Sequence, residues 1–384
     1  MASGRPAVID VTGLSLLIDV LRADGWAVIG PTVQDGVIGQ AEIQSLDDLP
    51  CGVGDEQDGA FYRLRVRDDA AYFGYVLGPQ SWKSVLFPSR ELVRRARPGN
   101  DPSTAREHDP ELRPLALFGV RSCDLHAIAV HDQVLTSRAV VDDHYAERRE
   151  GTFIVAVTCA DPAGTCFCTS MGTGPDPTEG FDLALTELLD DRGHRFLVRP
   201  GTDKGVAILE RLPKQPVLDA DRTTAAAVVE SASGRMGREL DTSDIRDLLY
   251  ANPDHPQWDD VANRCLACSN CTLVCPTCFC TSVEDSTSLV DGTSDRWRVW
   301  DSCFTSEFSY LHGGSVRATT KSRYRQWATH KLAAWWDQFG TSGCVGCGRC
   351  ITWCPAAIDL TAEVAALRAT PSADTLTPPA TQED

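Results

Sequence analysis

The sequence predicts an α/β region over residues 1–240 and a mainly helical region over residues 241–366, built around two cysteine motifs. Two observations predict this division. In the first part, short apolar runs alternate with helix-like segments, which is the pattern of strands and helices packed in layers. In the second part, a long segment with helical periodicity joins the two motifs. A chain of 384 residues is long enough for two or three such units.

The N-terminal part begins with segments in which we recognise no chemistry. Residues 14–21 have the apolar spacing of a helix, and residues 61–66 and 71–77 have the composition of strands. Residues 98–114 are rich in Pro, Asp, Arg and Glu. We therefore expect an exposed loop there.

The middle of the chain alternates between predicted strands and helices. Apolar runs at residues 115–120 and 152–157 suit buried strands, and a helix-like segment, residues 125–135, follows the first run. The pattern continues with a predicted helix, strand and helix at residues 181–189, 195–198 and 204–212. Ligands of such sheets gather at the carboxyl ends of strands, where Cys123 and Cys159 follow the two apolar runs.

Two cysteine motifs with identical spacing dominate the C-terminal part. They are C-x2-C-x2-C-x3-C-P runs at residues 265–276 and 344–355. Such a run gives three thiolates to one [4Fe-4S] cluster and the fourth to a neighbouring cluster, so the sequence predicts two clusters with crossed ligation. The expected ligand sets are Cys265, Cys268, Cys271 and Cys354 for one cluster, and Cys344, Cys347, Cys350 and Cys275 for the other.

Structural zinc is the alternative for these motifs, but zinc ribbons use two C-x2-C pairs per metal, whereas each run here has a third and a fourth cysteine. Between the runs, residues 321–339 repeat aromatic side chains at helical spacing, which resembles an α-helical ferredoxin. We expect these aromatics to form core, with electron relays as the alternative. A further helix is predicted at residues 243–250. The Thr-, Pro- and acid-rich tail, residues 367–384, is expected to be disordered.

Eight further cysteines are left once two clusters are built, and the hexapeptide Thr-Cys-Phe-Cys-Thr-Ser occurs twice, at residues 165–170 and 277–282. Four of these cysteines are expected at one face of the α/β region: Cys123, Cys159, Cys166 and Cys168. Two interpretations are open for them, a third iron–sulfur cluster or buried cysteines that pack as small hydrophobic residues. The others are expected to pack beside the two clusters or to be structural: Cys278, Cys280 and Cys303 in the first case, and Cys51 in the second.

The composition argues against several classes of partner. With 36 Lys and Arg against 54 Asp and Glu, the net charge is −18, so no nucleic-acid partner is expected. We see no membrane span of about 20 apolar residues and no secretory signal, and the free thiols suit a reducing cytoplasm.

One stretch, residues 308–336, has five Lys or Arg and no acid. It either compensates the anionic clusters or forms a solvated helix face.

The sequence carries metal ligands but no motif of a nucleotide site or a catalytic centre. It has no GxGxxG after a predicted strand, no P-loop, no HExxH and no nucleophile elbow. The missing flavin and nicotinamide fingerprints favour an electron carrier over a self-contained reductase.

Several segments taken together resemble one known family. They are residues 119–125, 165–175, 298–303, 330–331 and 344–351. This combination resembles the iron–sulfur β subunit of cytosolic NAD(P)-linked [NiFe] hydrogenases, the sulfhydrogenases. The resemblance covers roughly residues 113–359. An iron–sulfur component of anaerobic sulfite reductase, its A chain, is similar in plan.

The resemblance implies a non-catalytic, cytoplasmic subunit. Such a subunit passes electrons between a flavin-containing NAD(P)H diaphorase subunit and the small and large subunits of a [NiFe] hydrogenase. The resemblance also implies that the eight motif cysteines hold two [4Fe-4S] clusters. Two alternatives are open: the corresponding iron–sulfur component of an anaerobic sulfite or sulfur reductase complex, and a self-contained iron–sulfur reductase.

Overall fold

The computed structural model describes residues 4–98, 113–137 and 139–369. Most of the loop predicted over residues 98–114, and most of the tail predicted over residues 367–384, therefore lie outside the described residues. Residues 367–369 complete the last helix, α13 (Leu360–Ala369).

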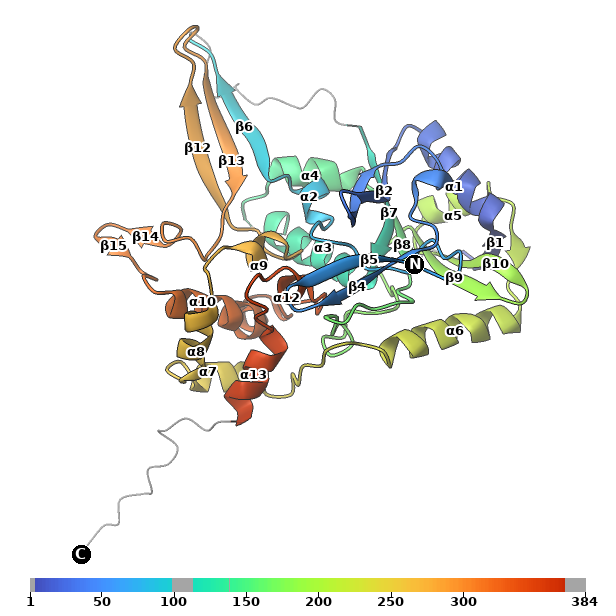
Figure 1. Cartoon of the computed structure of the whole chain (residues 1–384). Helices are drawn as coiled ribbons and strands as arrows, with labels where there is room; N and C mark the ends of the chain where they lie inside the picture. Colours follow the sequence, from blue (N-terminus) through green and yellow to red (C-terminus); the bar gives the residue numbers. More distant parts are fainter. Residues whose placement is uncertain (1–3, 99–112, 138, 370–384) are drawn as a thin grey trace, which may run out of the picture.

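An eight-stranded mixed sheet forms the centre of the N-terminal half (Figure 1). Its strand order is β11 (Gln215–Pro216), β1 (Ala7–Asp10), β10 (Gly193–Pro200), β9 (Leu183–Asp190), β8 (Phe153–Val157), β7 (Leu115–Arg121), β2 (Ala27–Gln34) and β3 (Val37–Glu42). The neighbours β2, β7, β8 and β9 run parallel, and the outer pairs are antiparallel. The N-terminal region is thus an α/β unit, as predicted.

Helices cover both faces of this sheet. On one face lie α1 (Val11–Ala23) and α5 (Asp203–Leu209), whose apolar side chains share one core with the strands. On the other lie α2 (Lys83–Leu86), α3 (Ser122–Leu135) and α4 (Asp143–Glu150). A further helix, α6 (Asp219–Ser233), packs on β9 and β10. The helix predicted over residues 14–21 is confirmed as α1, but it starts at Val11, because the Asp10 carboxylate accepts the Gly13 N–H at 2.9 Å and caps its N-terminus there.

Two of the local predictions are wrong. Residues 71–77, predicted as a strand, are an irregular buried segment: the Glu187 carboxylate accepts its N–H groups, and Arg121 donates to its carbonyls. Residues 181–189, predicted as a helix, contain strand β9. Leu183–Leu188 is buried between β8 and β10, so tertiary packing overrides the helix propensity of Leu and Ala.

The predicted strand at residues 61–66 is confirmed as β5 (Phe61–Val66), which pairs with β4 (Val53–Asp58). A short 3-10 turn, η1 (Leu46–Asp48), precedes this hairpin. The structure also confirms the predicted strand at residues 195–198, within β10, and the helix near residues 204–212, as α5.

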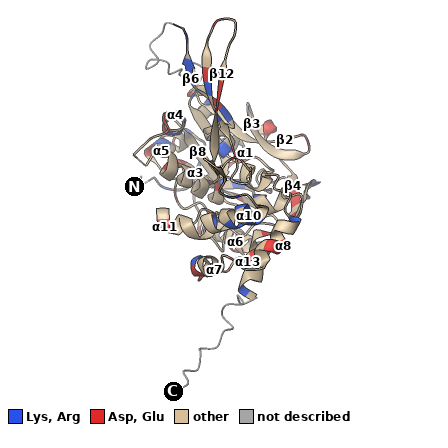
Figure 2. Cartoon of the chain, turned by 90° about the vertical axis from the view of Figure 1, so that its left-hand side faces the viewer, with Lys and Arg blue, Asp and Glu red and all other residues tan. Residues whose placement is uncertain are grey.

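The C-terminal half has its own core. Its walls are α7 (Ile245–Ala251), α8 (Gln257–Arg264), α10 (Thr320–Thr329) and α13. The helix predicted over residues 321–339 is α10, which continues through a π-helical turn (His330–Ala334) into α11 (Trp335–Phe339). The aromatics Tyr324, Trp327 and Trp335 are buried there, which confirms them as core. Figure 2 marks the charged residues along α8 and α10, and an ion pair of 2.8 Å between Lys321 and Asp259 joins the two helices.

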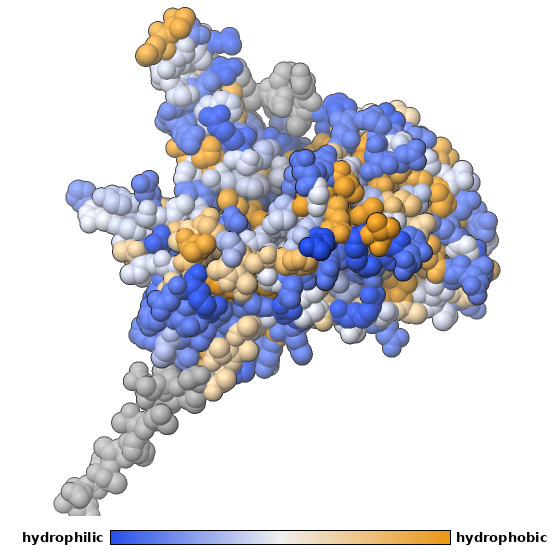
Figure 3. Space-filling view, in the orientation of Figure 1, coloured by the Kyte–Doolittle hydropathy of each residue, from blue (hydrophilic) through white to orange (hydrophobic). Residues whose placement is uncertain are grey.

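A three-stranded arm projects from the molecule (Figure 1). Its strands are β12 (Thr281–Thr287), β13 (Ser294–Trp300) and β6 (Arg90–Ala96), with β13 in the middle. Because β6 comes from the N-terminal half, the arm ties the two halves of the chain together. Its tip is apolar: Leu289 and Val290 are fully exposed (Figure 3). A small hairpin, β14 (Tyr310–Leu311) and β15 (Gly314–Ser315), lies below it.

No described helix is both long and apolar enough to cross a lipid bilayer.

Candidate iron–sulfur sites

Both cysteine motifs fold into the same tight loop. Ala267 (φ 50°) and Ser269 (φ 69°) adopt left-handed conformations in the first motif, and Gly346 (φ 65°) and Gly348 (φ 73°) do so at the same positions of the second. This conformation turns a backbone N–H toward the first thiol of each motif. The Ala267 N–H donates to Cys265 Sγ at 3.4 Å, and the equivalent bond of the second motif is 3.5 Å. Such donors favour the thiolate form of a cysteine.

Each loop then leads into a single helical turn, α9 (Asn270–Leu273) or α12 (Arg349–Thr352), which carries the third cysteine of its motif. The second loop needs its glycines because the first hexapeptide, residues 165–170, packs directly on it. The Phe167 N–H donates to Gly346 O at 2.8 Å. A Cβ on Gly348 would lie 2.2 Å from the Thr165 carbonyl oxygen, which is a clash with backbone.

Replacing Gly348 by Ala is therefore expected to cost about 2–4 kcal/mol of unfolding free energy, because it adds overpacking to a left-handed φ. Gly340 is the matched control, because it has a similar φ of 69° but no atom within 4 Å of an added Cβ. Gly340→Ala should cost about 1 kcal/mol. Denaturant unfolding of the two variants measures both values. Equal losses would show that the packing of the hexapeptide on the motif is not tight.

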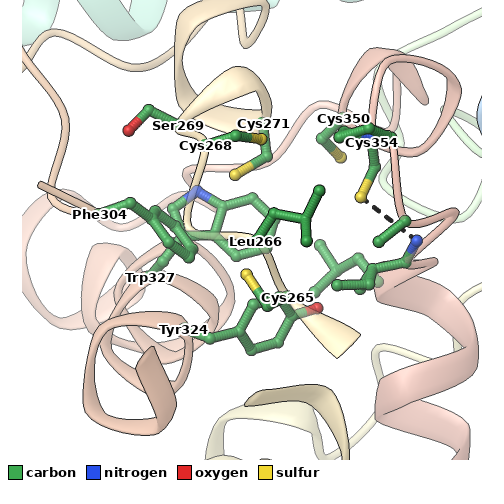
Figure 4. Close-up of a pocket in the computed structure, with 14 residues that line it drawn as sticks. Cys265, Leu266, Cys268, Ser269, Cys271, Phe304, Tyr324, Trp327, Cys350 and Cys354 are labelled. Carbon is green, nitrogen blue, oxygen red and sulfur yellow. Dashed lines mark hydrogen bonds between the residues drawn. The ribbon is translucent and has the colours of Figure 1, made fainter. Parts of the chain in front are cut away.

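The first cavity draws its thiols from both motifs (Figure 4). Cys265, Cys268 and Cys271 of the first motif and Cys354 of the second line one hollow. Leu266, Phe304, Tyr324, Trp327 and Ile358 give it apolar walls. The Ile358 N–H donates to Cys354 Sγ at 3.4 Å, which is the dashed line in Figure 4. The structure thus brings together the four thiols that crossed ligation requires.

The second predicted set lies next to the first. Cys275 is close enough to Cys344, Cys347 and Cys350 to influence their thiols electrostatically, and it also influences Cys271 of its own motif. Burial raises the pKa of Cys344 to about 12 and also raises the pKa of Cys347 and Cys350. Cys350 also lines the first cavity, so the two sets adjoin. A bound metal centre supplies the positive charge that buried thiolates need.

A third cavity joins the N-terminal thiols to the second motif. It is lined by Cys123, Cys159, Cys166 and Cys168 together with Cys347. Cys123 and Cys159 follow the adjacent parallel strands β7 and β8, so the carboxyl ends of these strands place both thiols at one edge of the sheet. Cys166 Sγ lies 3.8 Å from Cys347 O. The predicted N-terminal group therefore does converge, and it does so against the second motif.

A buried ion pair connects this third cavity to the second motif. Arg349, inside the motif, makes a two-pronged contact of 2.9 and 3.1 Å with Asp124, the neighbour of Cys123. Both side chains are buried, at 2% and 1% exposure. Arg121 also faces the cavity and is held by the Thr158 carbonyl at 3.0 Å. The third cavity thus has two guanidinium groups in its wall.

Two buried lysines lie beside the second set of thiols. Lys331 donates to Thr277 Oγ1 at 2.8 Å and to Gly343 O at 3.2 Å, and it faces the thiols of Cys275 and Cys344. A hydrogen bond from Cys278, followed by the Lys331 ammonium, lowers the pKa of Cys275 well below its usual range.

Residues 308–336, the basic stretch of the sequence, include both a cation beside the thiols and a cation on a solvated helix face. Lys331 is buried beside thiols, whereas Lys321 makes an exposed ion pair with Asp259. The other buried lysine, Lys83, donates to Leu273 O at 3.0 Å and stacks 3.8 Å over the Trp300 ring.

Sequence reasoning missed Lys83, Arg121 and the pairing of Asp124 with Arg349. An indication existed in the sequence for the ion pair only, because both of its charged residues are next to cysteines that were already candidate ligands. Lys83 gave none, because it lies 182 positions from the first motif and is placed by tertiary packing. Cys51 lies apart from the thiol sets, and its thiol donates to the Ala70 carbonyl at 3.2 Å.

The thiol-lined hollows and the two loops define an iron–sulfur protein of the dicluster class. Residues 264–358 match the 4Fe-4S dicluster domain family. The chain is 35% identical over 246 residues to sulfhydrogenase 2 subunit beta of Pyrococcus furiosus, which covers 63% of this chain and 71% of the relative. No solved structure matches it. The chain therefore belongs to the sulfhydrogenase β-subunit family, with the role of an iron–sulfur electron-transfer subunit.

Proposed function

We propose that this chain relays electrons between a flavin-containing NAD(P)H diaphorase subunit and the small and large subunits of a [NiFe] hydrogenase. The observation that carries the proposal is the contiguity of the three thiol groups. Cys350 of the second set lines the first cavity, and Cys347 of the same set lines the third. The second set therefore lies between the other two, as a relay requires.

The eight motif cysteines are proposed as ligands of two [4Fe-4S] clusters with the crossed sets given above, and Cys123, Cys159, Cys166 and Cys168 as ligands of a third. When bound, such clusters carry single electrons at potentials set by charge, hydrogen bonds to sulfur and exposure. The residues of the chain determine the charge, the hydrogen bonds and the exposure at each site. Apolar side chains line the first cavity, and buried cations face the second set and the third cavity.

The route is proposed to end at the surface beside the first motif. Cys268 is exposed, and Leu266 next to it is 67% exposed. The third cavity instead has Cys159, Cys166 and Cys168 buried in its wall. We place the docking site of one redox partner over Cys268 for this reason. In this proposal, residues 1–240 carry the third site and residues 241–366 the dicluster, and the complex works in the reducing cytoplasm.

The buried charge of Lys331 is expected to raise the midpoint potential of the second cluster, and this effect can be tested. Lys331→Met removes a buried cation that favours the reduced, more negative cluster. We expect the midpoint potential of the second cluster to fall by roughly 50–100 mV, equivalent to about 1–2 kcal/mol of Coulomb energy at an effective dielectric constant of about 20. EPR-monitored redox titration measures it. Lys321→Met, at the exposed end of the same helical segment, is the control and should leave the potential unchanged. A shift equal in both variants would contradict the electrostatic role.

Removal of the chain from the complex tests the proposed function. The hydrogenase subunits should still oxidise H2 with an artificial dye, and the flavin subunit should still oxidise NAD(P)H with a dye. H2-dependent reduction of NAD(P) should be lost. Coupling that survives the removal would contradict the relay. Co-purification of the chain with a sirohaem reductase would favour the sulfite reductase alternative.

A further inference from the structure

Arg121 is a buried cation that makes no ion pair within the described part of the chain. The residue is 3% exposed, and its terminal nitrogens donate only to backbone carbonyls. These are the carbonyls of Thr158 at 3.0 Å, Phe73 at 2.6 Å and Tyr75 at 2.8 Å. Carbonyl dipoles orient a guanidinium group but do not neutralise its charge. Such a charge is strongly unfavourable to bury unless an anion faces it.

The carboxylate of Asp55 influences Arg121 from beyond ion-pair distance. It is already engaged, because it accepts hydrogen bonds from the Gln57 amide at 2.8 Å and from the Val76 N–H. Burial also raises the pKa of Asp55 to about 6, which weakens its charged form. Asp55 therefore gives Arg121 only part of a counter-charge.

The third cavity presents the groups that can supply the rest. Arg121 lines it together with Cys159, and the charge of Arg121 favours the thiolate of Cys159, whereas burial raises the pKa of this thiol. Arg349 lines the same cavity, but its charge is matched by Asp124. The wall of the cavity therefore carries one positive charge that no carboxylate of the described residues pairs with.

Both guanidinium groups also keep one unused donor. The Nε–H groups of Arg121 and Arg349 are buried and have no hydrogen-bond partner among the described residues. Arg195 and Arg298 share this feature, but each of them pairs with two carboxylates. Among these four arginines, only Arg121 combines an unused donor with an unmatched charge. A buried donor without a partner calls for an acceptor, and cluster and thiolate sulfurs accept such bonds.

We propose that Arg121 and Arg349 donate these Nε–H groups to sulfur atoms of the third cluster, and that the charge of Arg121 raises its midpoint potential. The inference rests on the proposed function, because it takes the four N-terminal thiols of the third cavity as cluster ligands. Three of these thiols are buried, and burial disfavours the reduced, more negative state of a cluster. Arg121 offsets this effect, so the buried cluster stays reducible within the relay.

Redox titration of the complex tests the charge. EPR follows the signal of the third cluster, defined as the signal that a Cys166→Ser complex lacks. Arg121→Met should shift its midpoint potential to a more negative value, and Arg121→Lys, which keeps the charge, should shift it less. Arg211 pairs with Asp24 and does not line the cavity, so Arg211→Met should leave the potential unchanged. Equal potentials in wild type and Arg121→Met, or equal shifts in both Arg121 variants, would overturn the proposal.

Iron analysis of the wild-type complex separates this inference from the proposed function. About twelve irons per chain, with an unshifted potential in Arg121→Met, would refute the role of Arg121 alone. About eight irons per chain would refute the third cluster itself, and the inference would fall with it.

A second measurement uses only the wild-type chain, in case Arg121→Met does not accumulate. The complex is produced with arginine that carries the heavy nitrogen isotope in its guanidinium group. Pulsed EPR of the reduced third cluster then compares labelled with unlabelled complex. An Nε–H that bonds to cluster sulfur should give a nitrogen coupling that changes with the isotope. Identical couplings in the two complexes would overturn the proposed hydrogen bonds.

Discussion

Replacing Cys275 by Ser is expected to abolish the cluster of the other motif and spare that of its own. The thiol of Cys275 lies with Cys344, Cys347 and Cys350, and its sequence neighbour Cys271 lines the first cavity. Because the variant loses one of the four thiolates, most chains should lack the second cluster or hold it in a three-iron form.

EPR and Mössbauer spectra of the Cys275→Ser variant decide between crossed and local ligation. The converse variant, Cys354→Ser, should spare the second cluster and damage the first, because Cys354 lines the first cavity. Damage confined in each case to the cluster of the mutated motif would mean that each motif binds its own cluster, and the crossed sets would be wrong.

Breaking the pair between Arg349 and Asp124 is expected to give the largest change in stability. Arg349→Met leaves the Asp124 carboxylate buried without a partner, which typically costs about 3–5 kcal/mol. Iron at the third cavity should fall as well, because Arg349 forms part of its wall and Asp124 adjoins Cys123.

Two variants control this experiment. Lys321→Met breaks an exposed ion pair and should cost about 0–1 kcal/mol. The double variant Arg349→Met with Asp124→Leu removes both charges and should recover much of the lost stability. Denaturant unfolding measures all three variants. A loss below about 1 kcal/mol in the single Arg349 variant would show that the pair does not hold the two halves together.

The sequence sufficed for those features that depend on local spacing. The two motif loops, the apolar runs of β7 and β8 and the helix over residues 321–339 follow from periodicity or from ligand order. The convergence of Cys123 with Cys159 also followed, since parallel neighbouring strands end at one edge of the sheet.

Features set by distant contacts escaped sequence reasoning. Residues 181–189 have a helix-like composition, but they lie between β8 and β10, and only the assembled sheet decides that they form a strand. Residues 71–77 find their backbone partners in the side chains of Glu187 and Arg121, so they need no neighbouring strand. The pairing of β6 with β13 joins segments about 200 residues apart, and no local sequence pattern predicts this pairing.

The most direct test of the relay follows the clusters of this chain in time. The complex is reduced with H2 in the absence of NAD(P), mixed rapidly with NAD(P), and frozen at intervals for EPR. The account predicts that H2 reduces the clusters of this chain and that NAD(P) reoxidises them at least as fast as steady-state turnover. The signal of the second cluster should be lost or changed in a Cys275→Ser complex, and the coupled activity should be lost with it. Clusters that stay oxidised under H2, or that reoxidise more slowly than turnover, would contradict the assignment of this chain as the relay.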